Sequence, residues 1–352
     1  MGSRAAKRAS LVELVEMAEP LLRRAERECP RRGPGRRPTI PDWVLGALIM
    51  VAILKRRKSK SSQYRFLDQH RSELQKWLGI DKFPARSTYF DRYRRAHRLF
   101  QLAIKLQGRR ALTERVADAR SVTVDKSLIE SLGPAWHRSQ RIRGVVPRGV
   151  DRDSTWSYSE HHGWVQGYGF EVVVTAGKNG VVLPLLASVD TASLRESRTF
   201  LTKIAALPAA TKHVLADSGY DTNDIADAIE WRANGKPSGC RFLCRHVRKR
   251  KAKQCWRETH RRSARRVRRE ARAKYFRTAT ARRLYRRRGK TVEPFNQWFK
   301  NLFDLSDQVW HRGLDNNRTQ ILAAIFCYQL LLRHNRRRRA KHAQIQWALD
   351  GL

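Results

Sequence analysis

The sequence predicts a mixed α/β fold, with helices packed on a mixed sheet, preceded by a mostly helical region. Apolar residues follow helical spacing up to about residue 118. From Ser121, "SVTVDKSL" alternates β-branched and polar residues, as a strand does. The elements that follow are predicted in the order strand, β-hairpin, helix, strand, helix, strand, which is typical of a mixed sheet covered by helices. We therefore expect three parts: a helical region at 1–118, an α/β region at 119–335 with a basic helical segment at 246–288, and a basic tail at 336–352.

The first part is predicted to be helical and to contact DNA. "RRGPGRRP" (31–38) reads as a basic linker, and "PDWVLGALIMVAILKR" (41–56) opens with proline and stays apolar, which predicts a buried helix. Ser87 can cap a short basic helix. A capped basic helix after a short turn favours a helix-turn-helix reader of DNA, and three-helix packing without DNA contact is an equal alternative. The arginines expected to contact DNA here are Arg86, Arg92, Arg94 and Arg95.

The second part contains the predicted sheet. Two apolar runs, 170–176 and 181–189, flank "GKNG", which is a strong hairpin signal. "HVLADSG" predicts a short buried strand, and the helix after it is expected to be capped by Asp221 or Thr222. The other elements predicted here are an amphipathic helix at 196–207, a strand in "CRFLCR", a helix capped by Thr291 with an apolar stripe of Phe295, Trp298, Phe299 and Leu302, and a last buried helix from "NRTQILAAIF" onward.

The charge of the chain predicts a polyanionic partner. It contains 74 Lys and Arg against 32 Asp and Glu, a net charge of +42. A folded chain with this charge repels itself unless a polyanion is present, so double-stranded DNA is the expected partner. Five cysteines, an odd number in a long chain, argue against a secreted disulfide framework. The longest apolar runs fall short of the ~20 residues that cross a bilayer. No signal peptide and no membrane partner are expected, and a reducing cytoplasm fits best.

Three acids stand where a metal site needs them. Asp125 lies within the first predicted strand, Asp217 ends the strand "HVLA", and Glu293 lies in the first turn of a helix. Mg²⁺ prefers oxygen ligands, and two such ions held together assist in-line phosphoryl transfer. A single aspartate at a strand end is more often a helix cap or an ion-pair partner. Three acids in this order of elements favour a metal site.

Several sequence blocks resemble the DDE transposases of bacterial insertion sequences. They are "VTVDKSLI", "GYGFEVVVTAGKNGVVLPLLASVDTAS", "VLADSGYDT" and "YRRRGKTVEPFNQWFKNLF", and the resemblance as a whole covers roughly Ser121 to Asn335. The resemblance implies an RNase H-like catalytic domain. It also implies that Asp125, Asp217 and Glu293 form the catalytic, metal-binding triad, with Mg²⁺ or Mn²⁺, in two ions, as the cofactor. The cell would then be bacterial or archaeal.

The resemblance also implies a signature around the glutamate, formed here by Tyr285, Arg288, Glu293 and Lys300. The family pattern places the glutamate four residues after the arginine, whereas Glu293 follows Arg288 by five. Seven residues are close to two helical turns, so Glu293 and Lys300 are expected to share a helix face. Lys300 is then expected to steady a phosphate, and Tyr285 and Arg288 to contact the terminal nucleotides. A solvated basic face is the alternative for Arg288 and Lys300. The family triplet after the hairpin is altered to "RES" (195–197).

The function implied is that of a transposase that binds the ends of a mobile element and catalyses metal-dependent strand cleavage and strand transfer into target DNA, as a homodimer. The alternatives are a non-catalytic, domesticated or decayed relative that still binds DNA, and a different nuclease on the same fold. Two weaker signals remain. Cys240, Cys244, His246, Cys255 and His260 crowd one segment without the spacing of a common zinc finger, and His161 and His162 form a weak second candidate for metal. The insert between Asp125 and the hairpin is interpreted as a flexible DNA-facing loop with Trp136, Trp156 and Trp164 available for stacking.

Overall fold

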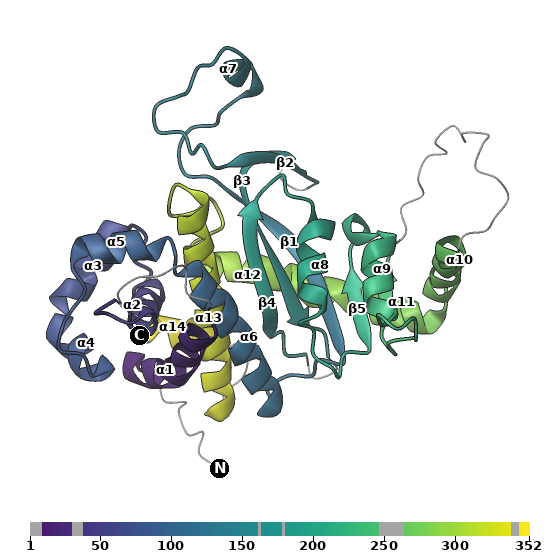
Figure 1. The fold of residues 1–352 in the computed structure, drawn as a ribbon, viewed down its shortest axis with the longest axis horizontal. Coiled ribbons are helices and arrows are strands. Elements are labelled where there is room, and N and C mark those ends of the chain that lie inside the picture. Colours follow the sequence, from purple (N-terminus) through teal and green to yellow (C-terminus); the bar gives the residue numbers. More distant parts are fainter. Residues whose placement is uncertain (1–8, 30–37, 161–162, 178–179, 246–263, 339–344) are drawn as a thin grey trace.

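Six strands form one mixed sheet in the middle of the protein (Figure 1). The structure is a computed structural model that describes residues 9–29, 38–160, 163–177, 180–245, 264–338 and 345–352. The strands are β1 (Ser121–Glu130), β2 (Thr155–Ser159), β3 (Gly163–Thr175), β4 (Pro184–Thr191), β5 (His213–Ala216) and β6 (Arg241–Cys244). Their order is β2-β3-β1-β5-β6, and β4 also pairs with β3.

The sheet is antiparallel on one side and parallel on the other. β3 pairs antiparallel with β1, β2 and β4, whereas β5 lies parallel to both β1 and β6. The predicted mixed sheet is therefore confirmed, as is the hairpin, which consists of β3 and β4. The sequence interpretation missed β2, although Trp156 and Tyr158 alternate there with small polar residues in the way that predicts a strand.

Six helices precede the sheet: α1 (Leu11–Glu28), α2 (Asp42–Leu54), α3 (Lys60–Gln69), α4 (Arg71–Leu78), α5 (Arg86–Tyr93) and α6 (His97–Thr113). The apolar run at 41–56 forms α2, in which every residue from Trp43 to Leu54 is buried. The predicted cap at Ser87 is wrong. α5 already begins at Arg86, so that Ala85 takes the N-cap position and Ser87 lies inside the first turn.

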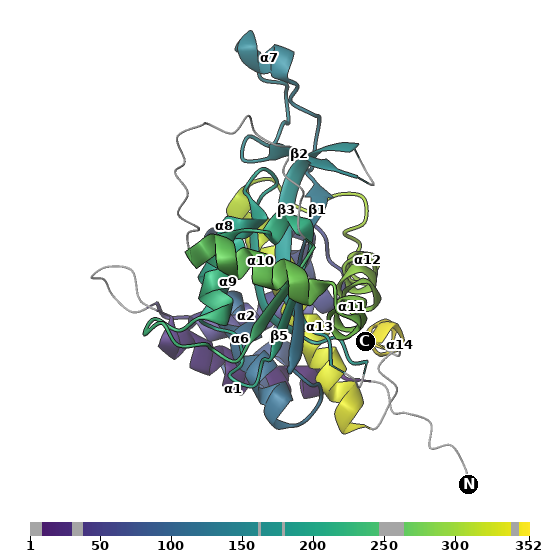
Figure 2. The ribbon, with the colours of Figure 1, turned by 90° about the vertical axis from the view of Figure 1, so that its right-hand side faces the viewer.

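The remaining helices cover the sheet or extend from it. They are α7 (Arg138–Ile142), α8 (Glu196–Ile204), α9 (Asn223–Glu230), α10 (Ala264–Phe276), α11 (Ala279–Tyr285), α12 (Val292–Leu302), α13 (Leu314–Arg337) and α14 (Ile345–Asp350), with short 3-10 turns η1 (Ser218–Tyr220) and η2 (Arg288–Lys290). Figure 2 places α8 and α9 on one side of the sheet and α11 and α12 on the other. Of the two predicted caps for α9, Thr222 is the one that accepts a bond from its first turn. Among the described residues, no helix is both long and apolar enough to cross a membrane.

The long helix α13 joins the N-terminal helices to the sheet. One hydrophobic cluster contains buried residues of α1, α2, α6, α12, α13 and the strands. Within it, the buried Gln329 amide donates both to the Ile104 carbonyl of α6 (3.0 Å) and to the Pro184 carbonyl of β4 (2.7 Å). Buried polar groups of this kind are costly unless they are bonded, so these contacts hold α6, α13 and β4 in one arrangement.

An ion pair between a buried arginine and a more exposed glutamate supports the same junction. The guanidinium of Arg333, on α13 and 1% exposed, donates to both carboxylate oxygens of Glu114 at the end of α6, at 2.5 and 2.6 Å. Burial alone would raise the pKa of Glu114. The hydrogen bonds and charge of Arg333, with help from Arg337 and Arg110, instead hold this pKa at about 2.

Glu114→Gln is expected to lower the free energy of unfolding by about 3 kcal/mol, because it leaves the buried Arg333 charge without its partner. Urea unfolding at neutral pH measures this change. Because the pKa of Glu114 is lower in the folded than in the unfolded chain, its stabilising effect is complete above the usual value of 4.5 and is lost as pH falls toward about 2. The difference between variant and wild type should shrink over that interval. Glu19→Gln, which breaks an exposed pair with Arg23, is the control and should cost less than about 1 kcal/mol. Equal losses of unfolding free energy in the two variants would contradict the stabilising role assigned to the Arg333–Glu114 pair.

Candidate active site

Asp125 lies in the middle of β1, the central strand of the sheet. Its carboxylate is on the same side of the strand as Thr123, whose hydroxyl lies 3.5 Å from that of Thr291, the residue just before α12. The side-chain amide of Asn296, on α12, donates to Asp125 Oδ2 at 2.9 Å. β1 and the first turns of α12 therefore fix the direction of this carboxylate.

Asp217 reaches the same place because β5 is the parallel neighbour of β1. Ala216 is in register with Val124, so the residues that follow them, Asp217 and Asp125, are also neighbours. The chain leaves the strand at this point: Asp217 Oδ1 accepts a bond from the Ser218 N–H (2.6 Å) and begins η1. The Cys244 thiol, at the end of β6, donates to the Asp217 carbonyl at 2.9 Å. Adjacent parallel strands thus bring two distant acids together.

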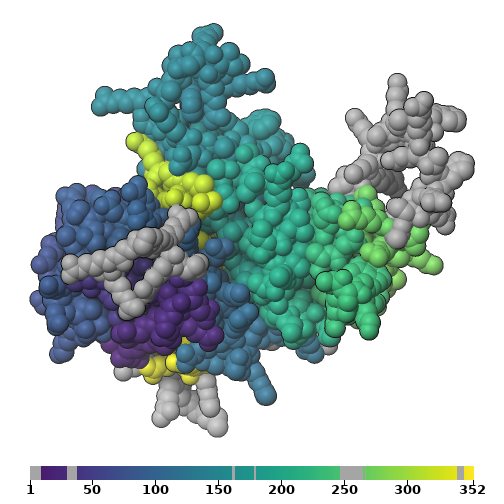
Figure 3. All heavy atoms as spheres, in the orientation of Figure 1, coloured from purple at the N-terminus to yellow at the C-terminus, as the bar shows by residue number. Residues whose placement is uncertain are grey.

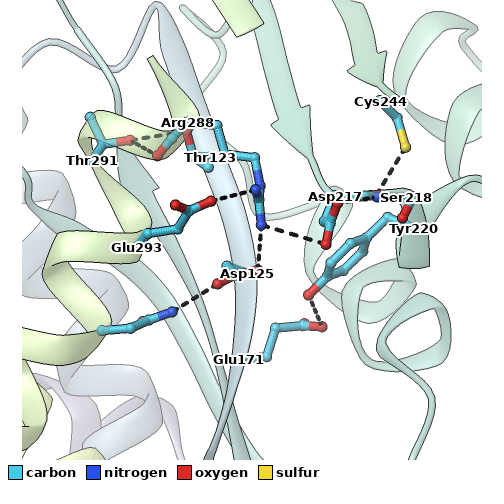
Figure 4. A network of polar contacts seen from close by, with 11 residues as sticks. Thr123, Asp125, Glu171, Asp217, Ser218, Tyr220, Cys244, Arg288, Thr291 and Glu293 are labelled. Atoms are coloured by element: carbon cyan, nitrogen blue, oxygen red, sulfur yellow. Dashed lines mark hydrogen bonds and ion pairs between the residues drawn. The ribbon is translucent and has the colours of Figure 1, made fainter. Parts of the chain in front are cut away.

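Glu293 lies across the site from the two aspartates, in the first turn of α12, with 53% of its side chain exposed. Between it and the aspartates lies Arg288, in the short turn η2. One guanidinium nitrogen, Nη1, donates to Glu293 Oε1 at 2.7 Å. The other, Nη2, donates to Asp125 Oδ1 at 3.0 Å and lies 3.7 Å from Asp217 Oδ2. Figure 4 shows the three carboxylates directed at this one guanidinium.

The three acids create a strongly negative site in a partly buried place. Burial is the main cause that raises the pKa of Asp125, to about 6, and the charges of Asp217 and Glu293 raise it further, while Arg288 acts in the opposite direction. Burial also disfavours the charged form of Arg288, but the neighbouring carboxylates more than offset this and raise its pKa. The guanidinium is therefore the counter-charge that the three carboxylates share.

Lys300 lies at the other end of α12, and the two residues of the predicted pair, Glu293 and Lys300, are both on this helix. The Lys300 ammonium donates to the Leu128 carbonyl of β1 at 2.6 Å rather than extending into solvent. Burial lowers its pKa to about 8, although Asp125 favours its charged form. It is thus a cation held against β1, three residues beyond Asp125.

Tyr285 is half-buried at the end of α11. Its ring packs edge to face on Phe276, with the centroids 4.9 Å apart. Burial raises the pKa of its hydroxyl to about 12, with smaller contributions from Asp217 and Cys244, which lie nearby. The hydroxyl therefore stays protonated at neutral pH beside the carboxylate site.

A fourth carboxylate, which the sequence interpretation did not assign, lies behind Asp217. It belongs to Glu196, the middle residue of the altered "RES" triplet, at the start of α8. A Cβ atom on Gly219, in "ADSGYD", would lie 2.5 Å from Glu196 Oε2, so this carboxylate packs directly against the backbone that follows Asp217. Burial raises the pKa of Glu196 to about 7, although Lys126 favours its charged form, and Asp125 and Glu171 add to the increase. The only sequence signal for it was the triplet itself.

The four N-terminal arginines predicted to contact DNA differ in their surroundings. Arg92 is tied down: it donates to the Ile40 carbonyl at 2.6 Å, pairs with Asp42 and is only 16% exposed. Arg94 is exposed and lies 3.8 Å from Asp91, and Arg95 is exposed as well. Arg86 lies over the Phe90 ring and contacts Ser61. Arg94 and Arg95 are therefore the two most open to a phosphate.

The weaker metal candidates gain no support from the described residues. Cys244 is buried against the Asp217 backbone, and Cys240 is half-buried with its pKa raised to about 11, mainly by burial. The other members of these sets, His161, His162, His246, Cys255 and His260, lie outside the described residues. The availability of Trp136 and Trp156 for stacking stays a prediction: both are partly exposed, and their indole N–H groups are bonded within the protein. Trp164 alone of the three is exposed.

Asp125, Asp217 and Glu293 have the donor chemistry of a hard divalent cation, which takes carboxylate and carbonyl oxygens. As the side chains stand, no group of three or more His, Cys, Asp or Glu within the described parts of the chain is arranged to hold a metal ion. Arg288 occupies the space that the three acids share. Beside Asp125, the buried Asn296 Oδ1 has no hydrogen-bond partner, so a further oxygen donor is available there. The donor set of the three acids therefore fits a hard divalent cation, at the position that the guanidinium of Arg288 takes up.

Comparison with known proteins gives one result. A family model described as "Transposase DDE domain" matches residues 110–330, well over half of the chain. The matched region includes Asp125, Asp217, Arg288 and Glu293. No curated protein and no solved structure matches the chain significantly.

Arg288→Gln is expected to lower the temperature of thermal unfolding in the absence of divalent ions, because three carboxylates lose their shared counter-charge. Added Mn²⁺ is expected to raise the unfolding temperature more in the variant than in the wild type, since the cation no longer competes with the guanidinium. Scanning calorimetry with and without Mn²⁺ measures both effects. Arg286→Gln, an exposed arginine two residues away, is the control and should behave as the wild type. An identical Mn²⁺ response in all three proteins would show that Arg288 does not occupy the cation site.

Proposed function

This chain belongs to the transposase DDE domain family, and from that membership we propose that it is an active transposase. In this proposal it binds the ends of a mobile DNA element of the insertion-sequence type, cleaves a strand there and joins the freed 3′ end to target DNA. Membership of the family implies a DNA substrate. The observation that carries the catalytic part is the convergence of Asp125, Asp217 and Glu293 on one cationic centre.

We assign these three acids as the catalytic residues and as ligands of Mg²⁺ or Mn²⁺, in two ions. When bound, such ions lower the barrier to in-line phosphoryl transfer by activating the attacking oxygen and stabilising the leaving one. Asp125, the most central and most buried of the three, would be the principal ligand of such ions. β1, β5 and α12 hold the three carboxylates in position before the substrate binds. The site can then contribute to catalysis by positioning the reacting groups and by neutralising their charge.

Arg288 and Lys300 are proposed to act on the DNA backbone. Once the carboxylates are neutralised, the guanidinium is free to form a paired contact with a phosphate near the cleaved bond. Lys300, held at β1 close to Asp125, remains charged at neutral pH because its pKa of about 8 is still above 7. It can therefore attract the next phosphate along the strand. Tyr285, beside Asp217, is proposed to contact a terminal nucleotide.

The finer features of the architecture belong to the same proposal. The β3–β4 hairpin on one side of β1 and parallel β5 and β6 on the other support an RNase H-like arrangement for residues 119–335. Residues 1–118 are proposed to form the DNA-binding, helix-turn-helix-like region, and 336–352 a basic tail. In the same proposal, the active form is a homodimer bound to two element ends, in the cytoplasm of a bacterium or archaeon.

One observation favours a second candidate, a DNA-binding relative without catalytic activity. The guanidinium of Arg288 satisfies all three acids at once, and such a network would also persist as a structural ion cluster. In that case the acids would stabilise the fold and would not bind metal. The substitutions below separate the two, because loss of a structural cluster lowers stability, whereas loss of a catalytic acid removes cleavage from a folded protein.

Asp125→Asn, Asp217→Asn and Glu293→Gln are each expected to reduce Mg²⁺-dependent strand cleavage at least about a hundredfold, since even groups that only support metal ligands are worth ten- to a hundredfold. The assay follows nicking of a plasmid that contains the DNA bordering the coding sequence, and gel shifts measure binding, which should be largely retained. Asp224→Asn, an exposed acid of α9, is the matched control and should cleave as the wild type does. Near wild-type cleavage by any of the three triad variants would remove that residue from the site.

Arg94→Gln combined with Arg95→Gln is expected to weaken DNA binding. The slope of log affinity against log salt should fall by about one for each phosphate that the variant no longer neutralises. Arg92→Gln should instead lower stability, because it breaks bonds to Ile40 and Asp42, and it should leave the slope nearly unchanged. Fluorescence anisotropy at several salt concentrations measures the slopes. If the double variant keeps the full slope, the segment just after α5 does not contact the phosphates.

A further inference from the structure

An arm projects from the end of the sheet between β1 and β2. It comprises residues 131–150, includes α7, and stands clear of the rest of the molecule (Figures 1 and 3). Its base is firmly attached. Asp151, which is buried, accepts from the Tyr168 hydroxyl (2.7 Å) and from the Gly313 N–H (3.1 Å), and the Ser131 N–H donates to the Gln166 carbonyl (2.9 Å). The arm is thus joined rigidly to β3 and to the start of α13.

The arm also has internal order. The Trp136 indole N–H donates to the Val145 carbonyl at 2.9 Å, and the Trp156 indole N–H donates to the Trp136 carbonyl at 3.0 Å. Gly144, with φ of 67°, reverses the chain after α7, and the Val145 N–H returns to the Gln140 carbonyl at 2.9 Å. This left-handed glycine turn closes the short helix. The tip is therefore a shaped element and not an open loop.

The tip of this ordered arm is apolar and exposed. Ile142 is 76% exposed, Val145 51% and Val146 40%. Eight large hydrophobic side chains are exposed among the described residues, and five of them belong to the arm or to the β2–β3 hairpin beside it. A concentration of this kind marks an interaction surface.

The arm is strongly basic around its apolar tip. Residues 131–150 contain four arginines, Arg138, Arg141, Arg143 and Arg148, and no aspartate or glutamate. Arg141 lies over the Trp136 ring, 4.7 Å from its centre. No ion pair within the described parts of the chain neutralises the other three. An apolar tip ringed by unneutralised arginines is complementary to DNA, where arginines contact phosphates and aliphatic side chains can enter between base pairs from the minor groove.

The position of the arm relative to the carboxylate site also suits a duplex. Asp125 lies five residues before Glu130, the end of β1, and the arm starts directly after it. At about 3.4 Å per residue the base of the arm is about 17 Å beyond Asp125 along the strand. That is about five base pairs of a duplex that follows β1. DNA held at the carboxylates can therefore reach the arm without bending away from the protein.

We propose that the arm docks on duplex DNA a few base pairs from the reacting phosphate, with Ile142 and Val145 inserted into the minor groove as a wedge that kinks the duplex. This inference rests on the proposed function for its substrate and adds how that substrate is held. A second protomer is the less suitable occupant. The chain has a net charge of +42, so another copy offers little acidic surface to a tip ringed by arginines.

The test uses the full-length protein and a short duplex that contains a TA step, which kinks easily, labelled at its two ends with a donor and an acceptor dye. Wild-type protein is expected to raise energy transfer between the ends as it bends the duplex, by about 20–90° for wedges of this class. Ile142→Gln combined with Val145→Gln should bind the duplex but lose most of that increase. The unfolding temperature should not change, because both side chains are exposed.

Val267→Gln is the matched control. Val267 is an apolar side chain, 48% exposed, on the basic helix α10, so the same substitution in a similar charge environment should leave bending intact. Arg138→Gln, Arg143→Gln and Arg148→Gln together should reduce the salt slope of binding by about 2 to 3. Wild-type bending by the Ile142/Val145 variant, or an unchanged slope for the arginine variant, would overturn the proposal.

Two further measurements separate this proposal from the proposed function. Asp125→Asn should bend DNA as the wild type does and fail to cleave it. If the wild type cleaves DNA and the Ile142/Val145 variant still bends it, the arm proposal alone is overturned. Bending that depends on the wedge, without cleavage by any form, would leave the arm proposal standing and overturn the enzymatic one. If light scattering without DNA shows that the Ile142/Val145 variant loses self-association, the tip is a contact between copies and the proposal is wrong.

Discussion

The contact of Arg288 with three carboxylates is the interaction on which the rest of this account depends. Ionised carboxylates that lie close together repel one another, and Asp125, Asp217 and Glu293 share a single counter-charge, the guanidinium of Arg288. The topology nevertheless brings them together, through the parallel pairing of β1 with β5 and the approach of α12 from the other side. If the site is to bind a catalytic metal ion, the cation that now lies between the carboxylates must be able to leave. The guanidinium fills that place and is also a group that binds phosphate.

The surrounding framework holds this arrangement at a fixed distance from the other elements that are proposed to face DNA. α13 joins the N-terminal helices to β4 through Gln329 and the Arg333–Glu114 pair. The same helix begins at Gly313, whose N–H bonds to Asp151 at the base of the arm. Helix α5, the carboxylate site and the arm are therefore parts of one continuous framework. A substrate that contacts all three would be held at several points along its length, and the high positive charge of the chain would favour each of them.

Much of the sheet could be predicted from the sequence, because its strands alternate or stay apolar over runs bounded by clear turns. The mixed order of elements and the β3–β4 hairpin were predicted on that basis. β2 was missed because its serines weaken the signal. The cap at Ser87 was wrong because helix starts vary by a residue or two. The three acids could be identified as candidates from a position within a strand, a strand end and a helix start. Their common contact with Arg288 could not, since it joins residues 163 positions apart. The sequence likewise held no sign that Trp136 and Trp156 bond within the arm while Ile142 and Val145 remain exposed.

The most direct test of the central claim is an anomalous-scattering experiment on crystals of the full chain grown with Mn²⁺. The account predicts an anomalous peak within about 2–2.6 Å of a carboxylate oxygen of Asp125 and of Asp217 or Glu293, with the guanidinium of Arg288 displaced from between them. Crystals that contain Mn²⁺ at saturating concentration, yet show Arg288 still bound to all three acids and no peak at that position, would contradict it.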